Sequence, residues 1–241
     1  MGNEAAAMAQ EAEHANELIH YGAVEWFPGV VINMQTMYMT WISMLIVFVL
    51  FYTASRNPQM IPSGLQNALE TIIDFLDGLM NQNIGEKGRK YMASFVITLF
   101  MFIFISNELG LLPQVGVHWT SPTNDINTCF ALSLLIAVSS YVVGVLRQGI
   151  GHFKHFISPS PAFLPLHLLD AMVKPLTLAL RLFGNILAGE ILLIVLYQLS
   201  PWVIPELWVI FSLFIGAIQA FIFTILSLGS FTVAFTDHNE H

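Results

Sequence analysis

The sequence predicts an all-α membrane protein with about five transmembrane helices and one amphipathic helix at the membrane interface. Hydrophobic residues make up 56% of the 241 residues and charged residues only 10%, whereas soluble domains are about a quarter charged. Long apolar runs recur between short polar segments, as bilayer-spanning helices require. The last two runs are longer than a bilayer is thick, so we expect both helices to be steeply tilted.

Composition also narrows the possible ligands and partners. The net charge is −8 and only 8 residues are Lys or Arg, which argues against nucleic acid as a partner. The single Cys129 excludes an internal disulfide and a cysteine-based metal cluster. The histidine spacing fits no metal site, so we expect no metal and no cofactor. No basic segment precedes an apolar run near Met1, so we expect no cleavable signal peptide.

The N-terminal part predicts a tail and then a single transmembrane domain. Residues 1–35 are polar and acidic, and we expect a solvated tail outside the membrane. The transmembrane domain covers 36–241, and its first span is 38–55. Trp41 and Tyr52 lie near the two ends of that span, where interfacial aromatic residues are enriched.

An amphipathic helix is predicted over 64–81. Ser63 and Gln66 have the spacing of a capping box, which would start this helix. Acidic and amide side chains occupy the face opposite to an apolar stripe, a pattern typical of a helix that lies at the membrane interface. The stripe consists of Leu65, Leu69, Ile72, Leu76 and Leu79.

Four further apolar runs complete the five predicted spans. Pro175 interrupts the fourth span and Pro205 lies near the start of the fifth. A polar turn at 122–127 leads into the third. The four runs are 92–112, 128–146, 166–199 and 202–235.

The distribution of Lys and Arg predicts the orientation. With one exception, Arg181, every basic residue falls on the same side of an alternating arrangement of the five spans. By the positive-inside rule that side is cytoplasmic, so we expect the N-terminus outside and the C-terminus inside. These residues are Arg56, Lys87, Arg89, Lys90, Arg147, Lys154 and Lys174.

The fourth span carries two charges that a lipid-facing helix would exclude. Arg181 lies well inside the apolar run 176–196, and Glu190 lies nearer its outer end. A charge at bilayer depth costs about 2.5–3.5 kcal/mol on insertion scales. Half a helical turn and about 13.5 Å along the axis separate the two side chains. They cannot pair directly, and Arg181 needs another partner.

Polar residues outline two routes that approach Arg181 from opposite sides. If the last two helices pack together, Glu190, Ser212 and Gln219 form a path that descends from outside. Its mouth could be formed by polar residues at the outer ends of the second and third spans, which are Asn107, Glu108, Asp125 and Asn127. The cytoplasmic approach is lined by His167, Asp170, Lys174 and Thr177.

Most of these residues also have a purely structural interpretation. Polar side chains inside a helix bundle more often join helices than conduct ions, which applies to Asn185, Ser212 and Gln219. Asn107 and Asp125 could equally cap helix ends. Arg181 fits a structural role least, because an arginine snorkels to polar surroundings only from near a helix end.

Ion transfer is the chemistry that an arginine at this depth supports. Arginine stays protonated at every working pH, so Arg181 cannot relay protons but can attract a passing carboxylate. That attraction is about 4 kcal/mol at about 4 Å and an effective dielectric constant near 20. No acidic residue of this chain is placed to be that carboxylate. We therefore infer that it belongs to a partner protein.

The arginine segment and its surroundings resemble a known family. Residues 174–190 (KPLTLALRLFGNILAGE) and 216–223 (GAIQAFIF) closely resemble subunit a of the F-type ATP synthase membrane sector. The resemblance covers about residues 38–235. Further segments are similar to the family in the same order, at 56–59, 61–64, 106–107, 111–113 and 121–127.

The resemblance implies a stator ion channel against which a ring of c subunits rotates. Arg181 matches the stator arginine that faces the carboxylates of the c-ring, and Asn185 matches the polar position one turn away. Outer half-channel positions are matched by Asn107, Asp125, Asn127, Glu190 and Gln219. Ser212 lies on the same outer path, and Asp170 is the candidate for the cytoplasmic exit.

The resemblance also implies the setting of the protein. The partners would be the c-ring, peripheral-stalk b subunits, the remaining ATP synthase subunits and the lipid bilayer. The location would be a bacterial plasma membrane, and no catalytic site is expected in this chain. The expected ion is H⁺, although the site that selects between H⁺ and Na⁺ would lie largely in the c-ring.

Two other functions stay open at this point. A self-contained secondary transporter would show inverted repeats and a midplane substrate pocket, and the sequence shows neither. A purely structural anchor would leave Arg181 and Glu190 dispensable.

Overall fold

The computed structural model describes residues 23–27, 30–56, 58–112, 120–149, 164–200 and 203–235. Five long helices fill most of these ranges, and each is long and apolar enough to cross a membrane. They are α2 (Met34–Arg56), α3 (Leu65–Leu109), α4 (Ile126–Gln148), α6 (Leu164–Leu199) and α7 (Ile204–Phe235), with a short 3-10 helix, η1 (Pro122–Asn124), before α4. The predicted helical, multi-pass membrane fold is confirmed.

A small antiparallel hairpin precedes α2. Strand β1 (Ala23–Phe27) pairs with β2 (Val30–Asn33), where the sequence predicts only a solvated tail. Valine, isoleucine and aromatic residues favour strands, and the hairpin is rich in them. The side chain of Asn33 then accepts a hydrogen bond from the backbone of Gln35 and so caps α2. The predicted tail before residue 23 lies outside the described residues.

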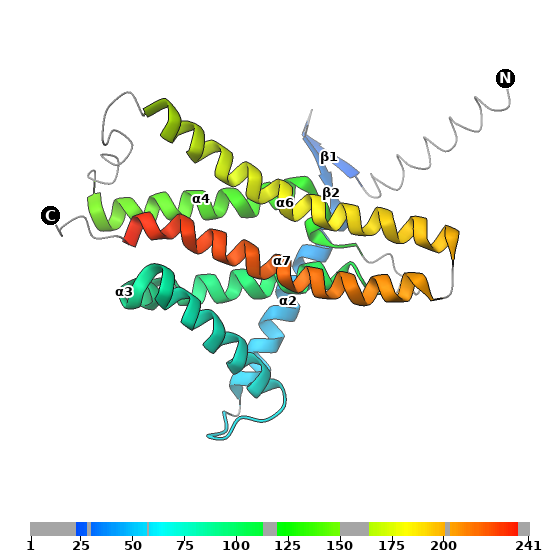
Figure 1. The fold of residues 1–241 in the computed structure, drawn as a ribbon, viewed down its shortest axis with the longest axis horizontal. Coiled ribbons are helices and arrows are strands. Elements are labelled where there is room, and N and C mark those ends of the chain that lie inside the picture. Colours follow the sequence, from blue (N-terminus) through cyan, green and yellow to red (C-terminus); the bar gives the residue numbers. More distant parts are fainter. Residues whose placement is uncertain are drawn as a thin grey trace.

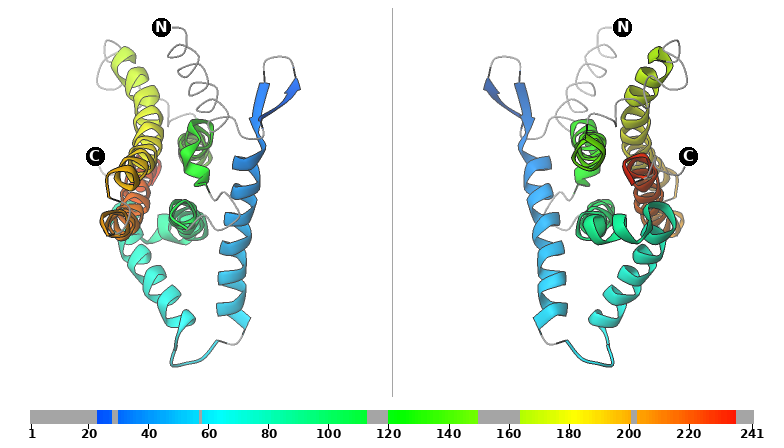
Figure 2. Two further views of the ribbon diagram at one scale, coloured as in Figure 1. Left: turned by 90° about the vertical axis from the view of Figure 1, so that its right-hand side faces the viewer. Right: turned by 90° about the vertical axis from the view of Figure 1, so that its left-hand side faces the viewer.

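Helix α3 is bent where the sequence places a glycine. Gly85 has φ 68° and ψ 177°, a left-handed backbone conformation that glycine adopts most readily. Figure 2 shows the segment before Gly85 leaving at an angle from the segment after it. The predicted amphipathic helix 64–81 and the predicted second span are therefore two segments of one bent helix.

The start of α3 differs from the predicted capping box. Gly64 stands at the N-cap position, and no side chain caps the helix there. The amide of Gln66 instead accepts from the backbone N–H of Gln59 and donates to its carbonyl oxygen, both at 3.1 Å. The predicted capping box is wrong because Gln66 reaches the preceding loop rather than the backbone of Ser63.

The apolar stripe of the first α3 segment packs partly against protein. Leu69 is buried in a small cluster with Val47 of α2 and Met101, and Leu76 is fully buried. Packing against other parts of the same chain therefore accounts for the burial of Leu69 and Leu76. An interfacial position for this segment stays a prediction.

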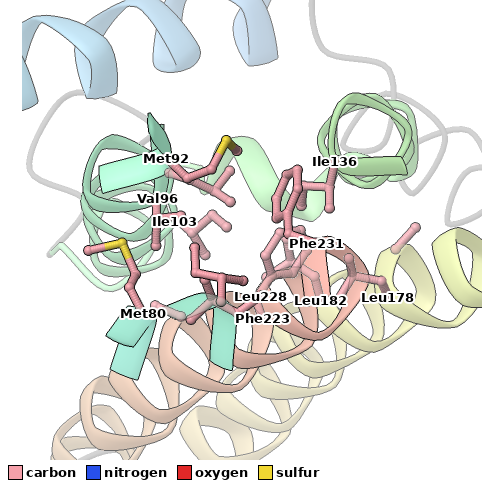
Figure 3. Close-up of a cluster of buried hydrophobic side chains, with 14 of the residues drawn as sticks. Met80, Met92, Val96, Ile103, Ile136, Leu178, Leu182, Phe223, Leu228 and Phe231 are labelled. Atoms are coloured by element: carbon pink, nitrogen blue, oxygen red, sulfur yellow. The ribbon is translucent and has the colours of Figure 1, made fainter. Parts of the chain in front are cut away.

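Helix α7 lies at the centre of the helical assembly. It contacts α3, α4 and α6, and these helices run side by side in Figure 1, with only the second segment of α3 aligned with them. Figure 2 shows α2 running across this group. The fully buried side chains of the core come from all four central helices and include Val96, Ile136, Leu182, Phe223 and Phe231 (Figure 3).

Helix lengths separate α2 from the last two helices. The 23 residues of α2 extend about 35 Å, close to the hydrocarbon thickness of about 30 Å. The 36 residues of α6 extend about 54 Å and the 32 residues of α7 about 48 Å. α4 has the same 23 residues as α2, so these two helices, unlike α6 and α7, have the length to cross a bilayer upright without excess.

Candidate functional site

A first cavity, the Glu190 cavity, lies between α6, α7 and the end of α3, with a volume of about 170 Å³. Its walls combine small residues and apolar side chains with a few polar groups. Glu190 and Asn185 come from α6, and Ser212 comes from α7. Asn107, at the end of α3, and Ser121 add further polar groups to the lining. Three residues of the predicted outer path, Glu190, Ser212 and Asn107, are therefore brought together. Asn185 lies in the same lining.

The carboxylate of Glu190 is held from a neighbouring element. The side-chain N–H of Asn124, in η1, donates to Glu190 Oε2. Next to it, the indole N–H of Trp208 donates to the carbonyl oxygen of Gly189 at 3.1 Å, which ties α7 to α6. These two contacts fix the position of Glu190 in the cavity wall.

Asn107 is a buried hydrogen-bonded junction between three elements. Only 2% of its surface is exposed. Its side-chain N–H donates to the carbonyl oxygen of Gly216 in α7 at 3.2 Å, and its oxygen accepts from the Thr123 hydroxyl at 2.9 Å. These contacts are not those of a helix cap, because the partners of Asn107 belong to η1 and α7.

Asp125 and Asn127 lie outside the cavity lining. Asp125 stands at the N-cap of α4, where its carboxylate accepts from the backbone N–H of Asn127 at 2.8 Å. This is the capping geometry that satisfies a free N–H group at a helix start. The alternative left open for Asp125, a capping role, is the one that its contacts show.

A second, larger cavity of about 550 Å³ lies along the earlier part of α6, from His167 to Arg181. We call it the Arg181 cavity. Its α6 lining includes Arg181, Asp170 and Lys174, and all three are exposed. The other helices contribute further polar lining residues, which are Asn83, Ser133, Ser140, Tyr141 and Ser230.

Packing of α6 places Arg181 at the surface. Leu178 and Leu182 are buried in the core, and Figure 3 shows both in the cluster that α6 shares with its neighbours. Arg181 is exposed, as are Gly184 and Ala188 further along the helix. No ion pair or hydrogen bond joins the guanidinium of Arg181 to any residue in the described ranges. The charge is therefore presented to the outside of this chain.

Along α6, about one helical turn separates the linings of the two cavities. The lining of the Arg181 cavity ends at Arg181, and that of the Glu190 cavity begins at Asn185. No residue lines both. The guanidinium thus lies where the two cavities approach each other along α6.

Comparison with known proteins identifies the family. The family model described as ATP synthase A chain matches residues 37–229. ATP synthase subunit a of Gloeobacter violaceus is 41% identical over 212 residues, covering 86% of each chain. ATP synthase subunit a of Streptococcus agalactiae serotype Ia is 40% identical over 215 residues, covering 83% of this chain and 90% of the relative.

The chain belongs to the ATP synthase subunit a family.

The family match spans every candidate site residue of this chain. It also extends over all five long helices, apart from the first residues of α2 and the last of α7. Within the described ranges, no group of three or more His, Cys, Asp or Glu side chains is arranged to hold a metal ion.

Gln219 is placed differently from the predicted path. It is buried, with 6% of its surface exposed, and it lines neither cavity. The α7 face formed by Ser212, Gly216 and Gln219 meets α3 at Gly216, through Asn107. The predicted packing of this face on α6 is therefore realised only in part, because Gly216 is bonded to α3 whereas Ser212 lines the cavity shared with α6.

Two residues that make contacts at this site are absent from the predicted candidates. Asn124 belongs to the polar turn 122–127, but nothing in the sequence pairs it with Glu190, which lies 66 residues later. The sequence predicts no role for Trp208, whose indole N–H joins α7 to α6. Both contacts depend on how η1 and α7 approach α6, which helical periodicity does not report.

Proposed function

We propose that this chain is the stator ion-channel subunit of a rotary F-type ATP synthase. The observation that carries the proposal is the position of Arg181, exposed and without a partner in the described ranges, between two cavities that share no lining residue. A permanent positive charge there would attract carboxylates passing along the outside of α6. The two cavities would deliver ions to those carboxylates and remove them.

The partner surface is formed by the exposed sides of α6 and α7. Apolar side chains surround Arg181 on this surface, so a partner helix could pack closely against it while presenting one carboxylate. Exposed apolar residues of the two helices include Leu180, Leu192, Ile210, Phe214 and Ile218. A c-ring of identical helices fits this requirement, because each c subunit would bring its carboxylate past Arg181 in turn.

The two cavities would act as offset half-channels. Protons from outside would enter the Glu190 cavity and pass Asn107, Ser212 and Asn185 to reach a ring carboxylate. After a rotation, the proton would leave through the Arg181 cavity past Asp170. Gln219, Asp125 and Asn127 would support the outer path from outside its lining. Direct leakage is opposed because Arg181 repels a proton at the point where the cavities approach.

A steep tilt of α6 and α7 follows if α2 stands upright. α2 has the length of one bilayer crossing, and it runs across the central helices (Figure 2). With α2 along the membrane normal, α6 and α7 would lie strongly inclined. Inclined helices would present a long surface to a ring.

The setting of the subunit follows from the same proposal. Basic residues at the ends of α2 and α4, and after the bend of α3, would face the cytoplasm by the positive-inside rule. The N-terminus would then lie outside a bacterial plasma membrane. The other partners would be the peripheral-stalk b subunits and the remaining ATP synthase subunits.

H⁺ is the proposed ion, and a Na⁺-translocating version of the same subunit is the alternative. Amide, hydroxyl and carboxylate groups line the Glu190 cavity, and such groups can pass protons through water. ATP-driven transport that needs no added Na⁺ would support H⁺, and a strict requirement for Na⁺ would replace it.

Substitution of Arg181 tests the function. In the complete ATP synthase, Arg181→Ala should abolish ATP synthesis driven by an ion gradient, whereas the subunits should still assemble, since Arg181 makes no hydrogen bond or ion pair within the described residues. Arg56→Ala is a matched control, because Arg56 is also exposed and lies at the end of α2. Retention of gradient-driven synthesis in the Arg181 variant would overturn the proposal.

A further inference from the structure

Glu108 is a carboxylate for which the described fold supplies no partner. It lies in the last turn of α3, next to Asn107. Both of its side-chain oxygens are buried, and neither accepts a hydrogen bond from any described group. A buried polar group without a hydrogen bond is costly, and a buried charge is far more so. The site therefore needs an additional proton, cation or water.

The space for this carboxylate comes from a glycine on the facing helix. A Cβ atom at Gly216 would lie 2.8 Å from Glu108 Oε1, which is closer than real contacts allow. Gly216 also lines the Glu190 cavity, as does Asn107. Glu108 thus lies directly behind the wall of that cavity, at the point where α7 has no side chain.

The groups around Glu108 are polar but not positively charged. Asn107 is already hydrogen-bonded to Gly216. Three residues further along α7, the side-chain nitrogen of Gln219 is buried without a partner among the described residues. Glu190 faces the same cavity from α6. The cavity lining contains no Lys, Arg or His, so a negative charge on Glu108 would not be compensated. A bound proton removes that charge.

We propose that Glu108 is a second proton-carrying carboxylate of the outer path, which takes the transported proton from the Glu190 cavity and passes it inward. This inference rests on the function proposed above. An O–H bond forms at Glu108 when the proton arrives and breaks when the proton moves on toward a ring carboxylate. No other reactant is consumed.

Substitution in the complete ATP synthase tests the role. Passive proton conduction is measured in membrane vesicles from which the catalytic sector has been stripped, with subunit content as the assembly control. Glu108→Gln should lower conduction about tenfold or more, and Glu108→Asp should retain most of it, because Asp still carries a proton. Glu206→Gln is the matched control, since Glu206 is exposed in the first turn of α7. Wild-type conduction in Glu108→Gln would overturn the inference.

A second variant tests the inference if the Glu108→Gln complex does not assemble. Gly216→Ala keeps the carboxylate but displaces it, and Gly78→Ala is its control, because a Cβ atom at Gly78 meets nothing within 4 Å. Assembled Gly216→Ala with conduction about fivefold lower supports the proposal, and unchanged conduction contradicts it. Arg181→Ala is measured in parallel. If Arg181→Ala uncouples ATP synthesis while Glu108→Gln conducts protons normally, the proposed role of Glu108 is wrong and the proposed function of the chain stands.

Discussion

The two cavities differ in how firmly their polar groups are held. In the Glu190 cavity, of about 170 Å³, the carboxylate is bonded by Asn124 and the amide of Asn107 is used twice. In the Arg181 cavity, of about 550 Å³, Asp170, Lys174 and Arg181 are exposed. One region is a small, preorganised polar site, and the other is a wide cavity with exposed charged side chains.

This difference suggests that the two regions depend on individual side chains to different degrees. A narrow cavity holds few waters, so each fixed group is part of the only available path. A wide cavity admits several waters, which can replace the hydrogen bonds of a lost side chain. Substitutions around Glu190 should therefore be more harmful than equivalent ones around Asp170.

The largest effect in this comparison is expected at Glu190. Glu190→Gln keeps the size of the side chain and can still bond to Asn124, but it cannot carry a proton. Gradient-driven ATP synthesis should fall on the order of a hundredfold. Synthesis rates in membrane vesicles measure this, and an Asp variant at the same position should restore part of the rate.

Loss of the Asn107 junction should reduce stability as well as transport. Asn107→Ala removes the hydrogen bonds that Asn107 makes with the Gly216 carbonyl and the Thr123 hydroxyl, at a cost of about 1–3 kcal/mol. Thermal unfolding of the purified complex should shift downward. Asn81→Ala, at an exposed position on α3, should leave the unfolding curve in place. An equal shift of the unfolding curve in both variants would contradict a special role of Asn107 in stability.

A moderate effect is expected at Asp170. Asp170→Asn should lower ATP-driven proton pumping only about threefold, because water in the wide cavity replaces the lost carboxylate. A loss as large as that of Glu190→Gln would break the comparison between the two regions. It would show that the Arg181 cavity also depends on one fixed group.

The smallest effect is expected at Ser212. It lines the Glu190 cavity, but its hydroxyl makes no hydrogen bond within the described residues. Ser212→Ala should change pumping by no more than about twofold, because water can take the place of the hydroxyl. A much larger loss would indicate that the hydroxyl itself carries the proton.

The sequence predicts the long helices well because they depend on local periodicity. Five long apolar runs specify five helices, and Leu178 and Leu182 on one side of α6 leave Arg181 on the exposed surface. Contacts between distant segments are different. The bond between Asn124 and Glu190 and the packing of Gln219 beside α3 depend on how helices meet. No spacing within one helix contains that information.

The bend of α3 also shows what periodicity leaves out. The amphipathic pattern of 64–81 is real, yet Gly85 joins it to the next span in one bent helix. The stripe then packs partly on α2 and the core. A hydrophobic stripe indicates burial, but it does not identify the surface that covers it.

The central claim is that the exposed face of α6 around Arg181 meets the carboxylate-bearing helices of the c-ring. Disulfide cross-linking tests it directly, with a cysteine placed beside the carboxylate of the ring helix and Cys129 replaced by Ala. Gly184→Cys lies on the exposed face with open space around its Cβ position, whereas Leu182→Cys lies in the core. We expect a cross-linked product for Gly184→Cys alone. Cross-linking of Leu182→Cys with none at Gly184→Cys would contradict it.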